Sequence, residues 1–247
     1  MKIKFWFLST ISALLLCTNS PLRVQANPEV FRDTVTQTLW WQLAVDNQLH
    51  LTQNHEYQGC IWGDSISSAL GDSLGKQNFN FAIGGMSTVS LIEQLKVLKP
   101  NHFQCQKAVI AIGTNDAMYG ISDAAFVENL KEVISFMRGM GTKEIILIPA
   151  FYSTVAASYD PNKAGTLTRV DEINALINQV AATENLVVES EGIQALFKDR
   201  ALNEDLTIDG VHLNEKGLEI YKQVLLKILS TPATARTRHP LSINLHQ

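Results

Sequence analysis

Short apolar runs alternate with segments of helical periodicity along most of this 247-residue chain. The runs are apolar at consecutive positions, which is typical of strands in a parallel sheet that helices cover on both faces. We expect five strands, at Gly59–Trp62, Phe79–Ile83, Ala108–Ile112, Glu144–Pro149 and Leu186–Val188. Helices are expected at Val89–Leu98, Ala124–Met140, Leu167–Thr183, Gly192–Lys198 and Glu215–Leu229. Repeated strand–helix units predict a parallel, doubly wound α/β sheet with its functional site at the carboxyl ends of the strands.

Composition agrees with one such domain. The chain is 46% hydrophobic and 18% charged, which suits a single core better than two. Its net charge is −4, and its basic residues form no cluster beyond the short segment Arg236-Thr237-Arg238. This balance argues against nucleic acid as a partner.

Two short motifs carry the residue types of a nucleophile and its base. Ser65 directly follows an apolar run in the tetrad 63–66, Gly-Asp-Ser-Ile, and Asp209 and His212 lie three residues apart late in the chain. A serine hydroxyl needs an imidazole to accept its proton, and the imidazole needs a carboxylate to fix its tautomer. Each motif alone is weak, because Gly-Asp-Ser is a common turn and Asp209 can cap the helix that begins near Asn214.

Two other strand ends supply candidate hydrogen-bond donors for an oxyanion. The run that ends at Ile83 breaks into paired glycines, the second of which is Gly85, and the run that ends at Ile112 is followed by Asn115. A glycine lets a backbone N–H approach a ligand closely, and an asparagine offers a side-chain N–H. We assign the oxyanion-binding role to the N–H groups of Ser65 and Gly85 and to the side chain of Asn115.

These four motifs, in this order, resemble the blocks of the SGNH hydrolases, also called the GDSL esterase/lipase family. The resemblance covers about residues 58–230 and departs at two positions: Ile66 stands where the family name has leucine, and Met86 where relatives often carry a polar residue. It implies a three-layer α/β/α sandwich with a five-stranded parallel sheet in the flavodoxin-like order 2-1-3-4-5. It also implies a serine esterase that uses Ser65, His212 and Asp209 and no metal or organic cofactor.

The resemblance leaves the substrate open among lipids, thioesters, acetylated sugars and small esters. Met86, Tyr119 and Phe151 are candidates for an apolar acyl site, but core packing is the preferred role for such residues near a sheet edge. Two other functions are weighed: an O-acyltransferase with the same residues, and a non-catalytic envelope or carbohydrate-binding protein. A pure binder has no use for a paired serine and histidine, so we prefer the hydrolase.

Two acidic residues beside the motifs are expected to be structural. Asp64 is read as a turn residue. Asp116 is expected to cap the following segment or to hold the asparagine, because an aspartate at a strand end usually bonds nearby backbone.

The first 26 residues have the pattern of a secretory signal peptide. Lys2 and Lys4 precede an apolar run, and Ala26 offers a cleavage site. We therefore expect an exported protein, secreted or periplasmic, with membrane association only if this segment is retained. Two alternatives are an uncleaved anchor, although the run is short for a span, and lipid attachment at Cys17, although Leu16 is bulky for such a signal.

Four segments follow from these features. They are the signal peptide at 1–26, an N-terminal helical extension at 27–57, the SGNH hydrolase domain at 58–230 and a flexible tail at 231–247. The extension holds a predicted amphipathic helix at Val30–Val45 with Trp40 and Trp41. We expect this helix to pack on the domain, with a position near the site mouth as the alternative. The oligomeric state is left open.

Removal of the leader leaves two cysteines, Cys60 and Cys105. Export permits a disulfide, but Cys60 lies three residues before Gly63 and Cys105 eight residues before Gly113. If the two glycines are level, the cysteines are staggered by roughly 16 Å along parallel strands. A disulfide needs Cα atoms within about 7 Å, so we expect two buried or partly buried thiols.

Overall fold

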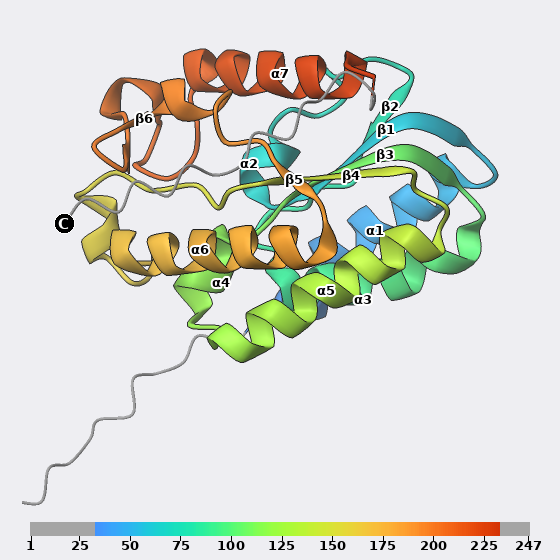
Figure 1. Ribbon diagram of the computed structural model, residues 1–247, viewed down its shortest axis with the longest axis horizontal. Coiled ribbons are helices and arrows are strands. Elements are labelled where there is room, and N and C mark those ends of the chain that lie inside the picture. Colours follow the sequence, from blue (N-terminus) through green and yellow to red (C-terminus); the bar gives the residue numbers. More distant parts are fainter. Residues whose placement is uncertain (1–32, 233–247) are drawn as a thin grey trace, which may run out of the picture.

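The computed structural model describes residues 33–232, and a parallel five-stranded sheet forms its centre (Figure 1). Its strands are β1 (Glu56–Gly63), β2 (Asn78–Asn80), β3 (Gln104–Ala111), β4 (Glu144–Ile148) and β5 (Val187–Val188). All neighbouring pairs are parallel, and the order across the sheet is β2-β1-β3-β4-β5. The predicted strand order is therefore confirmed.

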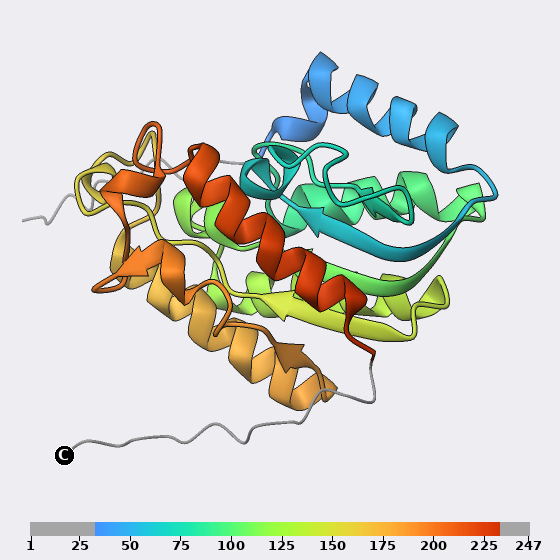
Figure 2. The ribbon, with the colours of Figure 1, turned by 90° about the horizontal axis from the view of Figure 1, so that it is seen from above.

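Helices cover both faces of the sheet, which confirms the three-layer sandwich (Figures 1 and 2). One face carries α1 (Leu39–Thr52), α3 (Thr88–Leu98), α5 (Asp123–Gly139) and α6 (Leu167–Glu184), and the other carries α7 (Glu215–Ser230). Two short helices begin at strand ends: α2 (Ser65–Ser68) follows β1, and α4 (Thr114–Tyr119) follows β3. A small hairpin, β6 (Phe197–Lys198) and β7 (Ala201–Leu202), precedes α7. Single 3₁₀ turns lie at Val35–Gln37, Lys99–Asn101, Ala157–Tyr159, Gln194–Leu196 and Glu204–Leu206.

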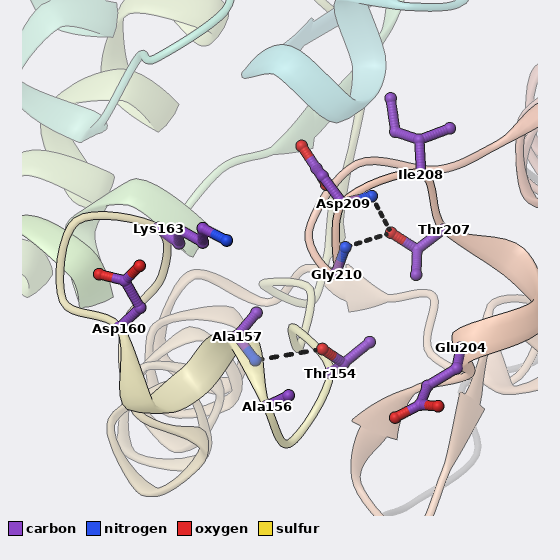
Figure 3. A pocket seen from close by; sticks show the side chains of 10 residues that line it. All are labelled: Thr154, Ala156, Ala157, Asp160, Lys163, Glu204, Thr207, Ile208, Asp209 and Gly210. Carbon is purple, nitrogen blue, oxygen red and sulfur yellow. Dashed lines mark hydrogen bonds between the residues drawn. The ribbon is translucent and has the colours of Figure 1, made fainter.

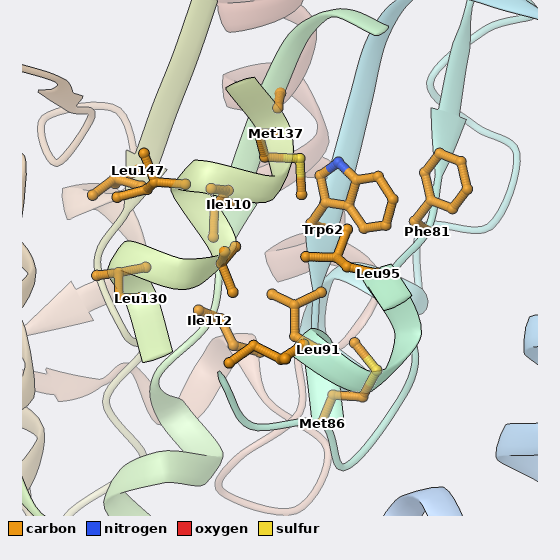
Figure 4. Close-up of a cluster of buried hydrophobic side chains, with 14 of the residues drawn as sticks. Trp62, Phe81, Met86, Leu91, Leu95, Ile110, Ile112, Leu130, Met137 and Leu147 are labelled. Carbon is orange, nitrogen blue, oxygen red and sulfur yellow. The ribbon is translucent and has the colours of Figure 1, made fainter. Parts of the chain in front are cut away.

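Each face of the sheet has its own apolar core. Trp62 belongs to the core under α3 and α5, whereas its neighbour Ile61 belongs to the core under α7. This explains why the first strand is apolar at consecutive positions. In the first core the rings of Trp62 and Phe81 stack with centroids 4.1 Å apart, and both side chains are fully buried (Figure 4). The stack joins β1 to the segment that follows β2, close to the strand ends.

One predicted helix, Gly192–Lys198, is wrong. The segment holds a single 3₁₀ turn at Gln194–Leu196 and then enters the hairpin. Asp199 and Arg200 form the hairpin turn with φ of +52° and +59°, in the left-handed region that non-glycine residues rarely adopt. The sequence does not indicate this turn, because neither residue is a glycine, the residue that usually marks positive φ.

The N-terminal helix is also displaced from its predicted position at Val30–Val45. It begins after Thr38, whose hydroxyl accepts the N–H of Trp41 as an N-cap, and it continues to Thr52. Beyond Val45 its buried positions are polar, Gln48 and Thr52, so the apolar pattern does not reveal them. The expected packing of the helix on the domain is confirmed, since Trp41 and Val45 are buried.

Cys60 and Cys105 form a disulfide, so the prediction of two thiols is wrong. That prediction took Gly63 as level with Gly113. The observed register pairs Gly63 with Ala111 instead, which brings the cysteines two residues closer along the strands. Strand ends that look equivalent in sequence are therefore not level in the sheet.

An irregularity in both strands closes the remaining distance. Tyr57 and Cys60 are three residues apart yet face the same core, and so do Cys105 and Ala108. A regular strand would place such pairs on opposite faces, so the alternation slips once in each strand. The Cα atoms of the two cysteines consequently lie 6.0 Å apart, within bonding range.

Several expectations fall outside the described residues. They are the signal peptide at 1–26, the first part of the helical extension at 27–32 and the tail from 233 to 247. Within residues 33–232, no helix is long and apolar enough to cross a membrane.

Candidate active site

The end of β1 presents Ser65 at the edge of the sheet. A side chain at Gly63 would lie 2.7 Å from the carbonyl oxygen of Ala111, so the close approach of β1 and β3 requires glycine there. Asp64 then caps α2, because its carboxylate accepts the N–H of Ile66 at 3.0 Å. Ser65 is thereby the first residue of the helix, and it is partly exposed. Burial raises the pKa of Asp64 to about 6, against the lowering effect of the Ile66 N–H and of His212. The turn role expected for Asp64 is confirmed.

The structure brings Ser65, His212 and Asp209 into one hydrogen-bonded chain. His212 Nε2 lies 3.0 Å from Ser65 Oγ, and His212 Nδ1 lies 2.7 Å from Asp209 Oδ2. Asp209 is unprotonated at neutral pH and accepts a hydrogen bond from Nδ1–H of His212. The lone pair on Nε2 then faces the Ser65 hydroxyl. This geometry can remove a proton from the serine.

Asp209 and His212 belong to one short loop that is held by internal hydrogen bonds and by one from the loop after β4, where the N–H of Thr154 donates to the carbonyl oxygen of Gly210 at 2.8 Å. Asp209 Oδ1 accepts the backbone N–H groups of Val211 at 2.9 Å and of His212 at 2.8 Å. Thr207 closes the loop: its hydroxyl donates to the carbonyl oxygen of His212 and accepts the N–H of Gly210. Burial alone would raise the pKa of Asp209, but the hydrogen bonds from His212 and Val211 lower it overall.

The second motif forms a loop beside the nucleophile. Gly85 has φ of +74°, a conformation that other residues rarely adopt. Its carbonyl oxygen accepts the hydroxyl of Tyr119 at 2.8 Å, which turns the peptide and fixes its orientation. Burial raises the pKa of Tyr119 to about 12, so this tyrosine stays a neutral donor. Among residues 33–232, no hydrogen-bond acceptor takes up the backbone N–H of Ser65 or Gly85.

Asn115 reaches the same loop from the end of β3. Its Nδ2 donates one hydrogen to the carbonyl oxygen of Met86 at 3.0 Å, and the amide is almost fully buried. A side-chain amide has two N–H donors, so the second remains for a ligand. Asn115 therefore bonds the residue that follows Gly85, and Gly84 of the same loop lies beside Ser65.

Asp116 is structural, as expected, but its partner is Thr88 on an earlier helix instead of the following segment or Asn115. It is fully buried and accepts both the N–H and the hydroxyl of Thr88, the first residue of α3. Burial raises the pKa of Asp116 to about 7, the bonds from Thr88 oppose this shift, and the nearby charge of Asp33 adds to it. The carboxylate thus ties α4 to the start of α3.

Sequence reasoning missed the residues that support the nucleophile from α7. Ser67 and Tyr221 share a buried hydrogen bond of 2.9 Å, which joins α2 to α7. The buried ammonium group of Lys107 donates to the carbonyl oxygens of Ile228 and Thr231 at the end of the same helix. These partners lie more than 100 residues apart, and no local pattern indicates them.

The apolar acyl-site candidates fall mainly in the core. Met86 is fully buried and its sulfur accepts the indole N–H of Trp41 at 3.4 Å, while Phe151 packs with Tyr221 under α7. Tyr119 supports the loop through its hydroxyl, as described above. The core role that we preferred for Met86 and Phe151 is therefore confirmed.

A cavity of about 500 Å³ adjoins the loop of Asp209 (Figure 3). The loop after β4 and the segment that ends at Gly210 face each other across it. Its lining is mostly polar, and the charged residues in it are Asp160, Lys163, Glu204 and Asp209. Ser65 and His212 do not line it. Within the described part of the chain, no group of three or more histidine, cysteine, aspartate or glutamate side chains is arranged to hold a metal ion.

Solved structures with this fold span most of the chain. A GDSL-like lipase from Bacteroides thetaiotaomicron has a TM-score of 0.61 at 15% identity, and the alignment covers 76% of this chain and 96% of the lipase. A lipase/acylhydrolase from Enterococcus faecalis has a TM-score of 0.52 at 21% identity, and the alignment covers 69% of this chain and 94% of the acylhydrolase. A mutant of an acetyl-xylooligosaccharide esterase from Geobacillus stearothermophilus has a TM-score of 0.53 at 18% identity, and the alignment covers 76% of this chain and 98% of the esterase. At these identities the likeness shows the fold alone.

The sequence itself gives the family. No curated protein matches the chain. The profile of the GDSL-like lipase/acylhydrolase family, however, matches residues 35–220, a stretch that includes Ser65, Gly85, Asn115, Asp209 and His212. The match covers well over half of the chain and agrees with the fold. This protein therefore belongs to the GDSL-like lipase/acylhydrolase family and is a carboxylic ester hydrolase.

Proposed function

We propose that the protein is a serine esterase in which Ser65 forms an acyl-enzyme. In the first step Ser65 Oγ attacks the ester carbonyl carbon while its proton passes to His212 Nε2. Asp209 stabilises the imidazolium that forms. The observation that carries the proposal is the unbroken hydrogen-bonded chain from Ser65 Oγ through His212 to Asp209.

The carbonyl oxygen becomes negatively charged in this step. Backbone N–H groups of Ser65 and Gly85 and the second N–H of Asn115 receive that charge. Removal of one donor of this kind typically costs about 3–4 kcal/mol of transition-state stabilisation.

The intermediate then collapses, and the C–O bond to the alcohol breaks. His212 returns its proton to the leaving alkoxide, so a neutral alcohol departs and the acyl group stays on Ser65. A water molecule attacks the acyl-enzyme, gives a proton to His212 and releases the carboxylic acid as Ser65 is restored. Esters of lipids and sugars are both compatible with this chemistry. An acyltransferase would replace the water by a sugar hydroxyl.

Export is part of the proposal. The leader at 1–26 has a charged start and an apolar run, as exported proteins do. The disulfide supports this location, because disulfides persist in oxidising compartments and are rare in the cytosol.

The test uses p-nitrophenyl esters from acetyl to palmitoyl with the purified protein and two alanine variants. Ser65→Ala should lower turnover by several orders of magnitude, since triad members act as a unit. Ser68→Ala is the matched control. Ser68 lies in the same short helix, and its hydroxyl donates to the Ser65 carbonyl oxygen, its one hydrogen-bond partner among residues 33–232. Ser68→Ala should retain turnover.

Hydrolysis that survives Ser65→Ala would remove Ser65 as the nucleophile. An active-site phosphonate offers an independent measurement, because mass spectrometry should find its adduct on Ser65. Turnover that rises on addition of a sugar acceptor would favour the transferase instead.

A further inference from the structure

We propose that Trp40 is a specificity-determining residue that contacts the acyl group of the substrate. The preferred esters then carry apolar acyl chains longer than acetyl. This assignment rests on the serine esterase function proposed above and extends it to the substrate class.

Trp40 stands beside the nucleophile. Its Cη2 atom lies 4.0 Å from the point where a Cβ on Gly84 would be, and Ser65 Cβ lies 3.5 Å from the same point. The two side chains thus border the same glycine, and residue 84 places no side chain between them. Trp40 is 47% exposed, whereas the adjacent Trp41 is 6% exposed. A large apolar ring that is left half in water next to a reactive hydroxyl has surface to offer a ligand.

The side from which Trp40 approaches indicates the acyl group rather than the alcohol. The reacting carbon has three substituents besides Ser65 Oγ: the oxyanion, the leaving alcohol and the acyl chain. The oxyanion meets Gly85 and Asn115, and the alcohol must face His212 to receive its proton. His212 precedes α7, and Trp40 belongs to α1, which lies on the opposite face of the sheet (Figure 1). The acyl chain is therefore the substituent left for Trp40.

The start of α1 is bonded to the loop of Gly85 and Met86, which fixes the backbone position from which the Trp40 indole extends. The neighbouring Trp41 donates its indole N–H to Met86 Sδ at 3.4 Å. Just before the helix, the carboxylate of Asp33 accepts the hydroxyl and the N–H of Ser87. A wall that is fixed before the substrate arrives loses little entropy on binding, which favours selection among acyl chains.

The experiment measures kcat/KM for p-nitrophenyl acetate, butanoate, hexanoate and octanoate with the wild type, Trp40→Ala, Trp40→Phe and Leu43→Ala. Full burial of one methylene of the acyl chain changes a binding equilibrium about fourfold. A single ring covers one side of the chain, so it buries roughly half of the surface of each methylene. Over about four methylenes the hexanoate-to-acetate ratio should fall about fifteenfold in Trp40→Ala. Trp40→Phe keeps an aromatic surface and should restore most of the ratio.

Leu43→Ala is the matched control, because Leu43 is 59% exposed one turn further along the same helix. It should leave the ratio unchanged. An unchanged ratio in Trp40→Ala, or an equal loss for every chain length, would overturn the assignment while Ser65-dependent hydrolysis persists. Absence of any Ser65-dependent hydrolysis in the wild type would instead overturn the proposed function, and this assignment with it.

Discussion

Loss of the disulfide between Cys60 and Cys105 should destabilise the protein strongly. The bond joins residues 45 positions apart in the sequence. In the chain-entropy description, a closed loop of this length lowers the entropy of the unfolded chain by an amount worth about 4 kcal/mol at 25 °C. Typical domains have a total unfolding free energy of about 5–15 kcal/mol, so this contribution is a large share.

Urea unfolding, followed by circular dichroism, measures the effect. The wild type is compared with the Cys60→Ala/Cys105→Ala double variant and with the wild type unfolded in dithiothreitol. Both should lose about 4 kcal/mol relative to the oxidised protein, and their m-values should rise because the unfolded chain is freer to expand. The double variant should be insensitive to dithiothreitol, which controls for other effects of the reductant.

Two outcomes would refute this reasoning. A double variant within about 1 kcal/mol of the oxidised wild type would show that loop closure does not govern the unfolded state. Reaction of both thiols with Ellman's reagent in urea, without reductant, would show that the bond does not form. The bridged segment contains Ser65 and Gly85, so loss of activity in urea should follow the same transition in each variant.

Two further predictions concern residues beside the nucleophile. Asn115→Ala should lower kcat about 10²–10³-fold with a smaller change in KM, because the oxyanion exists only in the transition state. Steady-state kinetics measure both constants. An effect confined to KM would mark Asn115 as a substrate contact instead. Burial raises the folded-state pKa of Asp116 from 3.8 to about 7, so the folded protein retains a proton that the unfolded chain releases. The unfolding free energy should therefore fall as the pH rises from 4 to 7, by up to about 4 kcal/mol, and Asp116→Asn should flatten this slope in urea titrations at several pH values; equal slopes would contradict the assignment.

Local patterns were enough to predict the sheet and the motifs at its edge. The apolar runs are short but continuous, and Ser65, Gly85 and Asn115 each lie within three residues of the end of such a run. Strand ends of a parallel sheet meet at one edge, so position in the sequence indicated position in space.

Relations between distant segments were not predictable in the same way. The stagger of β1 against β3 decides whether Cys60 can reach Cys105, and neither strand carries a local sign of it. The partnership of Tyr221 with Ser67 depends on where α7 lies over the sheet. The position of Trp40 beside Ser65 depends on the N-cap at Thr38, which shifts the helix from its expected start.

The internal hydrogen bonds of the loop from Thr207 to Leu213 reduce the number of parts that must be aligned in the proposed triad. Thr207 and Leu213 are joined by a β-bridge, and Asp209 and His212 are bonded to each other within the loop. The base and its carboxylate partner therefore move as one rigid piece. Within the proposed triad, only the distance from His212 Nε2 to Ser65 Oγ joins separate pieces and has to be kept by the rest of the fold. Distant sequence changes can thus accumulate without separating His212 from Asp209, as long as that distance and the placement of Gly85 and Asn115 are kept.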